Sequence, residues 1–299
     1  MNNKELIDLY LSSLSELSLE TIKNRRYILE EFLKALIDKP ILELQASDIR
    51  NYIIKKKECK EWTRASTIAI NLSTLKAFYG FLINENHLKE NPLKNIKRPR
   101  FASESEIRPL NNEEIRRLFK TASDSPWISL RDKLVFFIAI TSSLRAKEIA
   151  NIKRANIDLE KNLIYMPKED VKGGYRAKLV PISEKTKQLL ELYFIKYPSH
   201  NEYLFNTKGK KVARLLIYRA MRMVIDIAYP YKNSWTKPYG THLARHTFAS
   251  RWIESGGDIH ALRAIMGWTS FTQLDRYVNV SPEFIQKAAN KVEKKLYKV

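Results

Sequence analysis

The chain carries a set of side chains whose types and spacing suit chemistry on a phosphodiester. His242 and Arg245 stand three residues apart, and side chains with that spacing share one face of a helix. Trp268 follows with an indole N–H that can only donate, and Tyr277, nine residues further on, adds a phenol. Arg145 supplies an earlier, second guanidinium. Together these groups could hold a phosphodiester and attack it with the tyrosine.

Cleavage of a DNA strand by attack on phosphorus requires few parts. The nonbridging oxygens gain charge in the transition state and need preorganised donors. A nucleophile must stand in line, and the departing 5′ oxygen needs a proton. Arginine suits the oxygens because its planar fork donates two parallel hydrogen bonds and stays charged, each bond contributing about 1.5–3 kcal/mol. Each motif alone also fits an ordinary structural role, so the prediction depends on their joint occurrence.

Composition and charge restrict the class of protein. The 299 residues suffice for two domains, and the formal net charge of +20 favours a polyanionic partner. No apolar run approaches the roughly 18 residues of a membrane-spanning helix, and the amino terminus has no signal-peptide core. The single cysteine, Cys59, excludes an internal disulfide and fits a reducing compartment. These features predict a cytoplasmic nucleic-acid-binding protein, with a soluble basic protein as the alternative.

Residues 1–93 carry a helical pattern that predicts the first domain. Apolar residues recur near a 3.6-residue period, and in residues 63–83 they form one stripe. Side chains off that stripe could face DNA phosphates or water. We expect the following cations and hydroxyls to contact DNA: Arg64, Thr67, Ser73, Thr74 and Lys76. Asn91-Pro92 ends the block, because the residue before a proline disfavours helical geometry.

Residues 94–107 are predicted to link two domains. The stretch is cationic and interrupted by prolines, which is typical of an extended connection. Its basic side chains Lys97, Arg98 and Arg100 suit contact with the DNA backbone if the two domains close around a duplex. A solvated tether is the alternative.

Residues 108–299 are predicted to form a second, mixed domain. Helical patterns dominate it, but residues 163–166 and 177–182 resemble strands separated by the turn-forming Gly173-Gly174. Apolar side chains near helical spacing in residues 281–299 predict a C-terminal helix. The expected fold class is therefore mainly α with a small β-sheet, in which a helical domain precedes an α+β domain.

Taken in order, these motifs resemble those of the tyrosine recombinases, the phage-integrase and Xer family. The order is Arg145, a hairpin lysine, His242-x-x-Arg245, Gly267-Trp268 and Tyr277. The interval from Trp268 to Tyr277 matches the family's usual one. Residues 63–92 are similar to the end of the family's core-binding domain, and Val180-Pro181-Ile182 resembles the strand after its hairpin. The resemblance covers nearly the whole chain.

The resemblance implies a SAM-like core-binding domain and a catalytic domain that form a C-shaped clamp on DNA. It implies that Arg145, His242, Arg245 and Trp268 bind the scissile phosphate. Tyr277 would form a 3′-phosphotyrosine, and a hairpin lysine would protonate the 5′-hydroxyl leaving group. Glu148, three residues after Arg145, would support the site structurally.

The resemblance also implies the partners of the protein. Four protomers would assemble on two double-stranded sites with inverted repeats, and strands would exchange through a Holliday junction. The phosphotyrosyl bond conserves energy, so neither ATP nor metal nor another cofactor is expected. In family members the C-terminal helix docks on the neighbouring protomer, whereas packing on its own domain is the alternative. The need for an accessory protein is left open.

Three positions depart from the family pattern. Ser143 stands where glycine is common, and Trp268 stands where histidine is usual, although some members carry tryptophan. Counting back from Val180-Pro181 by the usual hairpin length reaches Gly173 instead of a lysine. Lys172 fits with one extra turn residue and is the preferred general acid. Lys168 and Lys178 are the alternatives.

Three functions remain in competition. The first is a site-specific recombinase, in Xer-like dimer resolution or in integration and excision of a mobile element, and the compact length favours the Xer-like layout. The second is a DNA-binding regulator that has lost catalysis, which the complete set of Arg, His, Arg and Tyr argues against. The third is a type IB topoisomerase, which the core-binding resemblance argues against.

Overall fold

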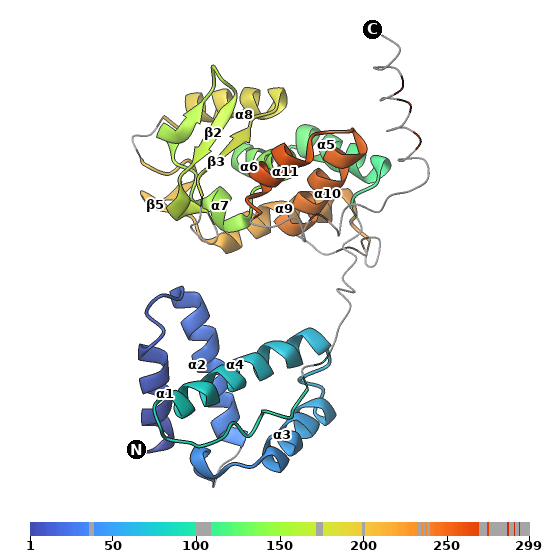
Figure 1. Ribbon diagram of the computed structural model, residues 1–299. Helices are drawn as coiled ribbons and strands as arrows, with labels where there is room; N and C mark the ends of the chain where they lie inside the picture. Colours follow the sequence, from blue (N-terminus) through green and yellow to red (C-terminus); the bar gives the residue numbers. More distant parts are fainter. Residues whose placement is uncertain are drawn as a thin grey trace. The chain divides into compact units, whose positions relative to one another are not determined.

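A computed structural model describes most of the chain. The described residues are 1–35, 39–97, 99, 109–171, 176–198, 201–231, 235, 237, 240–268, 274, 286, 290 and 293. The chain divides into two compact units, Met1–Ser105 and Glu106–Val299 (Figure 1). Helices dominate both units and the strands form small antiparallel sheets, so the predicted fold class is confirmed. The assignment of residues 94–107 as a linker remains a prediction.

Unit 1 is built from helices. They are α1 (Asn3–Ser12), α2 (Leu19–Ala35), the short 3-10 turn η1 (Ile41–Glu43), α3 (Ala46–Glu58) and α4 (Ala65–Asn84). Side chains define the helix starts: the Asn2 side chain accepts from the Glu5 N–H, and the Ser18 hydroxyl accepts from the Thr21 N–H at 3.2 Å. Such bonds satisfy backbone donors that have no partner inside the helix.

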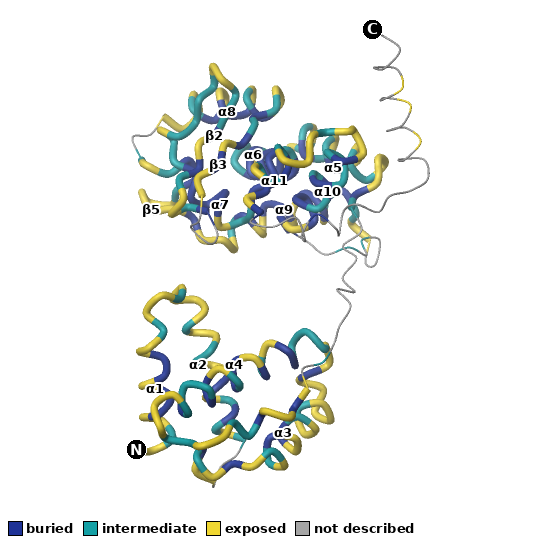
Figure 2. The backbone as a smooth tube through the Cα atoms, viewed as in Figure 1, coloured by how far each residue is buried: buried dark blue, intermediate teal, exposed yellow. Residues whose placement is uncertain are grey.

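Helix α4 forms the centre of unit 1. Leu75, Phe78 and Tyr79 are fully buried, and the Tyr79 hydroxyl donates to the Ile41 carbonyl at 3.2 Å. Figure 2 shows the buried stretches of α4 facing its neighbours. Among the described residues, α4 is also the one helix long and apolar enough to cross a membrane by length and composition. This corrects the expectation that no stretch approaches that limit, although a core helix passes the same test.

Unit 2 combines helices with two small sheets. Its elements are α5 (Asn112–Asp124), α6 (Leu130–Ser142), α7 (Ala146–Ala150), η2 (Arg154–Asn156), β1 (Ile157–Asp158), β2 (Leu163–Met166), η3 (Lys168–Asp170), β3 (Lys178–Pro181), α8 (Glu184–Lys196), β4 (Asn206–Thr207), β5 (Lys210–Lys211), α9 (Arg214–Ala228), α10 (Thr241–Glu254) and α11 (Ile259–Met266). The start of α5 is a capping box in which Asn111 and Glu114 bond each other's backbone N–H groups.

The larger sheet has the order β1-β2-β3 with antiparallel pairing throughout. Leu163 pairs with Pro181, and Met166 pairs with Lys178. The two strands expected from the sequence are therefore confirmed. The register matters for the site, because it places Lys178 at the first residue of β3 with its side chain on the buried face.

Helix α6 is the core of unit 2. Val135, Phe136 and Ile138 are fully buried, and α8, α9 and α10 pack around the helix (Figure 1). Because α6 is enclosed on several sides, the position of its C-terminal end is fixed. The C-terminal end of α6 carries Ser143 and leads directly into Arg145, so the packing of this helix positions the first arginine of the site.

Candidate active site

Arg145 lies where the chain leaves α6 and begins α7. It is the N-cap of α7, and its backbone N–H donates to Glu148 Oε2 at 2.9 Å. Its guanidinium Nη1 donates to Glu148 Oε1, also at 2.9 Å. The Arg145 side chain is 21% exposed, whereas that of Glu148 is 1% exposed. The sequence spacing therefore produces a buried carboxylate that orients a half-buried arginine.

A third donor reaches Glu148 from the sheet. Lys178 Nζ donates to Glu148 Oε2 at 2.8 Å, and the Lys178 side chain is only 2% exposed. This ion pair joins β3 to α7. Because the Lys178 ammonium is bound by a buried carboxylate, it is poorly placed to donate a proton to a leaving group.

The pKa values of this pair reflect burial and neighbouring charge. Burial alone would raise the pKa of Glu148, but Lys178 and the donors of Arg145 lower it to about 2. Burial lowers the pKa of Lys178 to about 8, and the cations Arg245 and Arg145 act in the same direction, while Glu148 opposes them. Both groups are therefore charged at neutral pH.

Arg245 is held by two backbone carbonyls. It lies on α10 and is buried, with Nη1 donating to the Ser143 carbonyl at 2.7 Å and Nη2 donating to the Met266 carbonyl. Ser143 ends α6 and Met266 ends α11. Because Ser143 precedes Arg145 by two residues, these bonds bring the two predicted arginines into one cluster.

His242 and Trp268 complete the described part of the cluster. His242 is exposed on α10, one turn before the buried Arg245. Trp268 follows Gly267, which ends α11 with a φ of +64°, and packs in a small apolar cluster that includes Leu262. A Cβ on Gly267 would lie 3.9 Å from Lys178 Cδ, so the end of α11 packs on the start of β3.

The remaining predicted site residues have different outcomes. Lys172 and Tyr277 lie outside the described residues, and their roles remain predictions. Within the described part of the chain, no group of acidic, histidine or cysteine side chains could hold a metal ion. Neither the pairing of Lys178 with Glu148 nor the carbonyls that hold Arg245 were predicted from the sequence. For the carbonyls that hold Arg245, Gly267 was the available indication, because glycine commonly follows the last residue of a helix.

The predicted DNA contacts of unit 1 divide into two groups. Arg64 and Ser73 are exposed, and Thr67 and Lys76 are partly exposed, although the Ser73 hydroxyl donates to the Ala69 carbonyl at 2.8 Å. Thr74 is buried and donates its hydroxyl to the Ile70 carbonyl, so the prediction that it faces phosphate is wrong. In the linker, Lys97 is exposed, whereas Arg98 and Arg100 lie outside the described residues.

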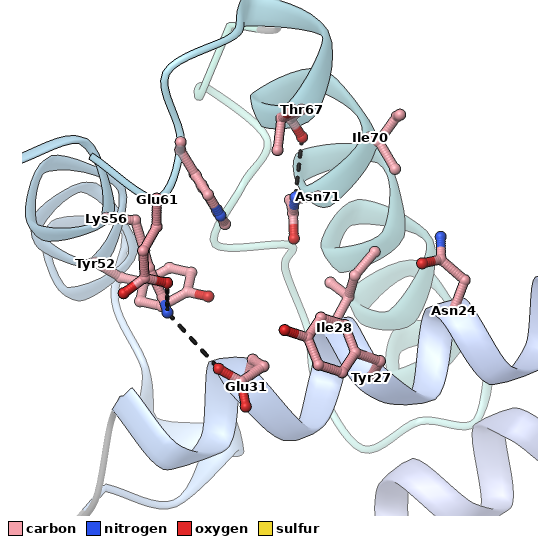
Figure 3. Close-up of a pocket in the computed structure, with 11 residues that line it drawn as sticks. Asn24, Tyr27, Ile28, Glu31, Tyr52, Lys56, Glu61, Thr67, Ile70 and Asn71 are labelled. Atoms are coloured by element: carbon pink, nitrogen blue, oxygen red, sulfur yellow. Dashed lines mark hydrogen bonds and ion pairs between the residues drawn. The ribbon is translucent and has the colours of Figure 1, made fainter. Parts of the chain in front are cut away.

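Unit 1 also has a pocket of about 340 Å³ between α2, α3 and α4 (Figure 3). The hydroxyl ends of Tyr27 and Tyr52 face one another across it. Lys56 lies against Glu31 at 3.8 Å and against Glu61 at 2.5 Å. Two carboxylates around one ammonium disfavour a further anion, so this pocket is not a second phosphate site.

The chemistry of the site in unit 2 follows from this geometry. Two arginines and a lysine outnumber the single buried carboxylate, and an exposed imidazole lies on the same helix as one arginine. Such a site can hold a phosphate and stabilise charge that develops on its oxygens. This combination of fold and cationic site is typical of enzymes that transfer phosphoryl groups on polyanionic substrates.

Two family models match the chain. The phage integrase family matches residues 108–283, and the phage integrase N-terminal SAM-like domain matches residues 7–86. The chain belongs to the phage integrase family. It is a site-specific tyrosine recombinase, an enzyme that breaks and rejoins DNA strands. The resemblance inferred from the motifs is thereby confirmed, and the regulator and topoisomerase alternatives receive no support.

Curated relatives are similar over most of their length. Tyrosine recombinase XerC of Leptospira interrogans is 26% identical over 257 residues, which cover 84% of this chain and 79% of that protein. Tyrosine recombinase XerC of Staphylococcus saprophyticus is 25% identical over 285 residues, which cover 91% of this chain and 90% of the relative.

Solved structures share the fold at lower identity. The Tn1549 transposon integrase in complex with a circular intermediate DNA has a TM-score of 0.76 at 16% identity, covering 97% of this chain and 99% of that one. XerH bound to a palindromic difH substrate has a TM-score of 0.75 at 18% identity, covering 98% and 85% respectively.

The backbone conformation at Ser143 is one that favours glycine, the residue expected here from the family pattern. The φ of Ser143 is +57°, in the left-handed region, and its hydroxyl is buried without a hydrogen-bond partner among the described residues. This conformation turns the Ser143 carbonyl toward Arg245. A residue with a Cβ pays a conformational cost of roughly 1–2 kcal/mol there, which glycine avoids.

We therefore expect Ser143→Gly to raise the free energy of unfolding by about 1 kcal/mol, because relief of backbone strain exceeds the added entropy of the unfolded chain. Ser142→Gly, in the last turn of α6, is the matched control and should lower it. Urea unfolding followed by circular dichroism measures both. A Ser143→Gly protein no more stable than the native one would contradict this account of the strain.

The lowered pKa of Glu148 predicts a specific acid sensitivity. Its folded value of about 2 lies below the ordinary 4.5, so the ionised carboxylate contributes stability that is complete above pH 4.5 and is lost as the pH falls toward 2. Unfolding free energy should therefore decline more steeply over that range in the native protein than in Glu148→Gln. Glu160→Gln, which changes an exposed glutamate, should decline like the native protein. Equal slopes for all three would refute the pairing.

Proposed function

We propose that Tyr277 attacks the scissile phosphate and that Arg145, His242, Arg245 and Trp268 bind it. The observation that carries the proposal is the hydrogen bond from Arg245 Nη1 to the Ser143 carbonyl. Because Ser143 lies two residues before Arg145, this bond supports one cluster of the two arginines. An arginine pair fixed in this way can contact both nonbridging oxygens of a phosphodiester.

The proposed reaction proceeds in two balanced steps. The Tyr277 phenol gives up its proton to water, and its oxygen forms a bond to phosphorus as the bond to the 5′ oxygen breaks. The 5′ oxygen takes up a proton, which gives a 3′-phosphotyrosine and a 5′-hydroxyl. Attack by the 5′-hydroxyl of a second strand reverses the step and releases the tyrosine. Lys172 is our candidate for the proton donor to the leaving oxygen. The burial of Lys178 against Glu148 supports Lys172 over Lys178 for that role.

The substrate we propose is double-stranded DNA with an inverted-repeat site. Four protomers would exchange strands between two sites through a Holliday junction in the cytoplasm, without metal or other cofactor. The net charge of +20 supports a polyanionic partner. Basic and hydroxyl side chains of unit 1 and the linker would contact its backbone: Arg64, Thr67, Ser73, Lys76, Lys97, Arg98 and Arg100.

Two biological settings fit this reaction. The XerC names of the curated relatives support an Xer-like exchange between chromosomal or plasmid sites. The likeness to a transposon integrase extends to the fold alone, so integration of a mobile element is the second candidate. We also propose that residues 281–299 dock on a neighbouring protomer, as in the family, and leave open an accessory protein.

The test is covalent capture of DNA. Cells that express the native protein, Tyr277→Phe or the control Tyr231→Phe, an exposed phenol of unit 2, are lysed under denaturing conditions. DNA that stays attached to the protein is then sequenced. We expect attachment in the native and Tyr231→Phe proteins and none in Tyr277→Phe, because only an ester to Tyr277 survives denaturation. Attachment that persists in Tyr277→Phe would overturn the assignment of the nucleophile.

A further inference from the structure

Lys178 is a buried cation with no part in the reaction as described so far. Its ammonium is held at 2.8 Å from Glu148 Oε2, and its side chain is 2% exposed. Removal of a lysine ammonium from water is costly, so a chain that needed only a packed strand would place an apolar residue there. The burial of Lys178 next to two arginines therefore calls for a function that depends on its charge.

The two carboxylate oxygens of Glu148 accept from different donors, and this arrangement indicates what the function is. Oε1 accepts from Arg145 Nη1, while Oε2 accepts from the Arg145 backbone N–H and from Lys178. Among the described residues, no hydrogen bond uses Arg145 Nε or Nη2. The guanidinium thus meets its carboxylate through one nitrogen, although a two-nitrogen fork on both oxygens is the stronger geometry for such a pair.

We propose that Lys178 is a positioning residue for strand cleavage: by occupying Glu148 Oε2 it prevents Arg145 from closing as a fork on that carboxylate, and it leaves the rest of the guanidinium for the scissile phosphate. The inference rests on the proposed role of Arg145. Without Lys178, the Arg145 fork would be drawn onto both oxygens of Glu148 and away from the DNA.

The charge of Lys178 adds to this effect. Glu148 carries one negative charge beside Arg145, and it would weaken the field that Arg145 presents to a phosphate. Lys178 compensates that charge, so Arg145 keeps its attraction for the oxygens on which charge develops. Burial lowers the pKa of Lys178 to about 8, which leaves the ammonium protonated at neutral pH.

The packing around Lys178 fixes its position. It is the first residue of β3 and pairs with Met166. Gly267 covers its side chain, since a Cβ built on Gly267 would lie 3.9 Å from Lys178 Cδ. Gly267 directly precedes Trp268. The side chain that holds Glu148 therefore also supports the turn that presents a proposed phosphate ligand.

The experiment separates cleavage from binding. The probe is a nicked duplex with the sequence recovered by covalent capture, and the variants are Lys178→Met, Lys178→Arg and the control Lys161→Met. Lys161 forms an exposed ion pair with Asp158 at 3.2 Å in the same unit. Covalent-complex formation is timed at saturating DNA, the dissociation constant is measured separately, and rates are scaled to the folded fraction from circular dichroism.

We expect Lys178→Met to slow cleavage by about a hundredfold or more, as loss of one preorganised donor does, while the dissociation constant changes by less than about fivefold. Lys178→Arg, which keeps the charge and a donor, should recover most of the rate, and Lys161→Met should match the native protein. If Lys178→Met does not fold, Lys178→Leu replaces it, because leucine also removes the donor to Glu148 Oε2 and has a different shape to pack.

A folded Lys178→Met or Lys178→Leu protein that cleaves at the native rate would overturn the proposal. So would a failure of Lys178→Arg to recover any of the lost rate, since that outcome indicates packing alone. A native protein that forms no covalent complex would instead refute the proposed function, so the two failures are distinguishable.

Discussion

The site depends on one buried carboxylate. Glu148 is almost inaccessible to water, and a charge in such a place is tolerated only when donors surround it. Those donors include the backbone and side chain of Arg145 and the ammonium of Lys178, which come from the start of α7 and the start of β3. The need to satisfy one carboxylate therefore fixes the helix that carries the first arginine against the sheet.

Helix ends hold the second arginine. Arg245 donates to the carbonyls of Ser143 and Met266, at the C-terminal ends of α6 and α11, where the helix dipole concentrates partial negative charge. The enclosed core helix α6 positions one of these carbonyls and also Arg145. Left-handed backbone at Ser143 and Gly267 makes both helix ends possible. The position of Arg245 is thus a consequence of where α6 and α11 end.

The sequence indicated candidate residues for the site but not the contacts between them. The order of motifs predicted Arg145, His242, Arg245 and Trp268 as site residues, and the strand-like segments on either side of Gly173-Gly174 predicted β2 and β3. Register decides which strand residue turns inward, so the pairing of Lys178 with Glu148 required the structure. Thr74 was misassigned because α1 and α2 both pack on α4, so more than one stripe of that helix is buried.

The most direct test is the coupling free energy between Glu148 and Lys178. Urea unfolding of Glu148→Gln, Lys178→Met and the double variant gives the coupling from a double-mutant cycle. We expect a coupling of at least about 2 kcal/mol, with the double variant more stable than the sum of the two single losses implies, because Glu148→Gln leaves the Lys178 ammonium buried without its carboxylate and Lys178→Met removes a donor from buried Glu148. Losses that add within about 0.5 kcal/mol would show that the ion pair does not organise the site.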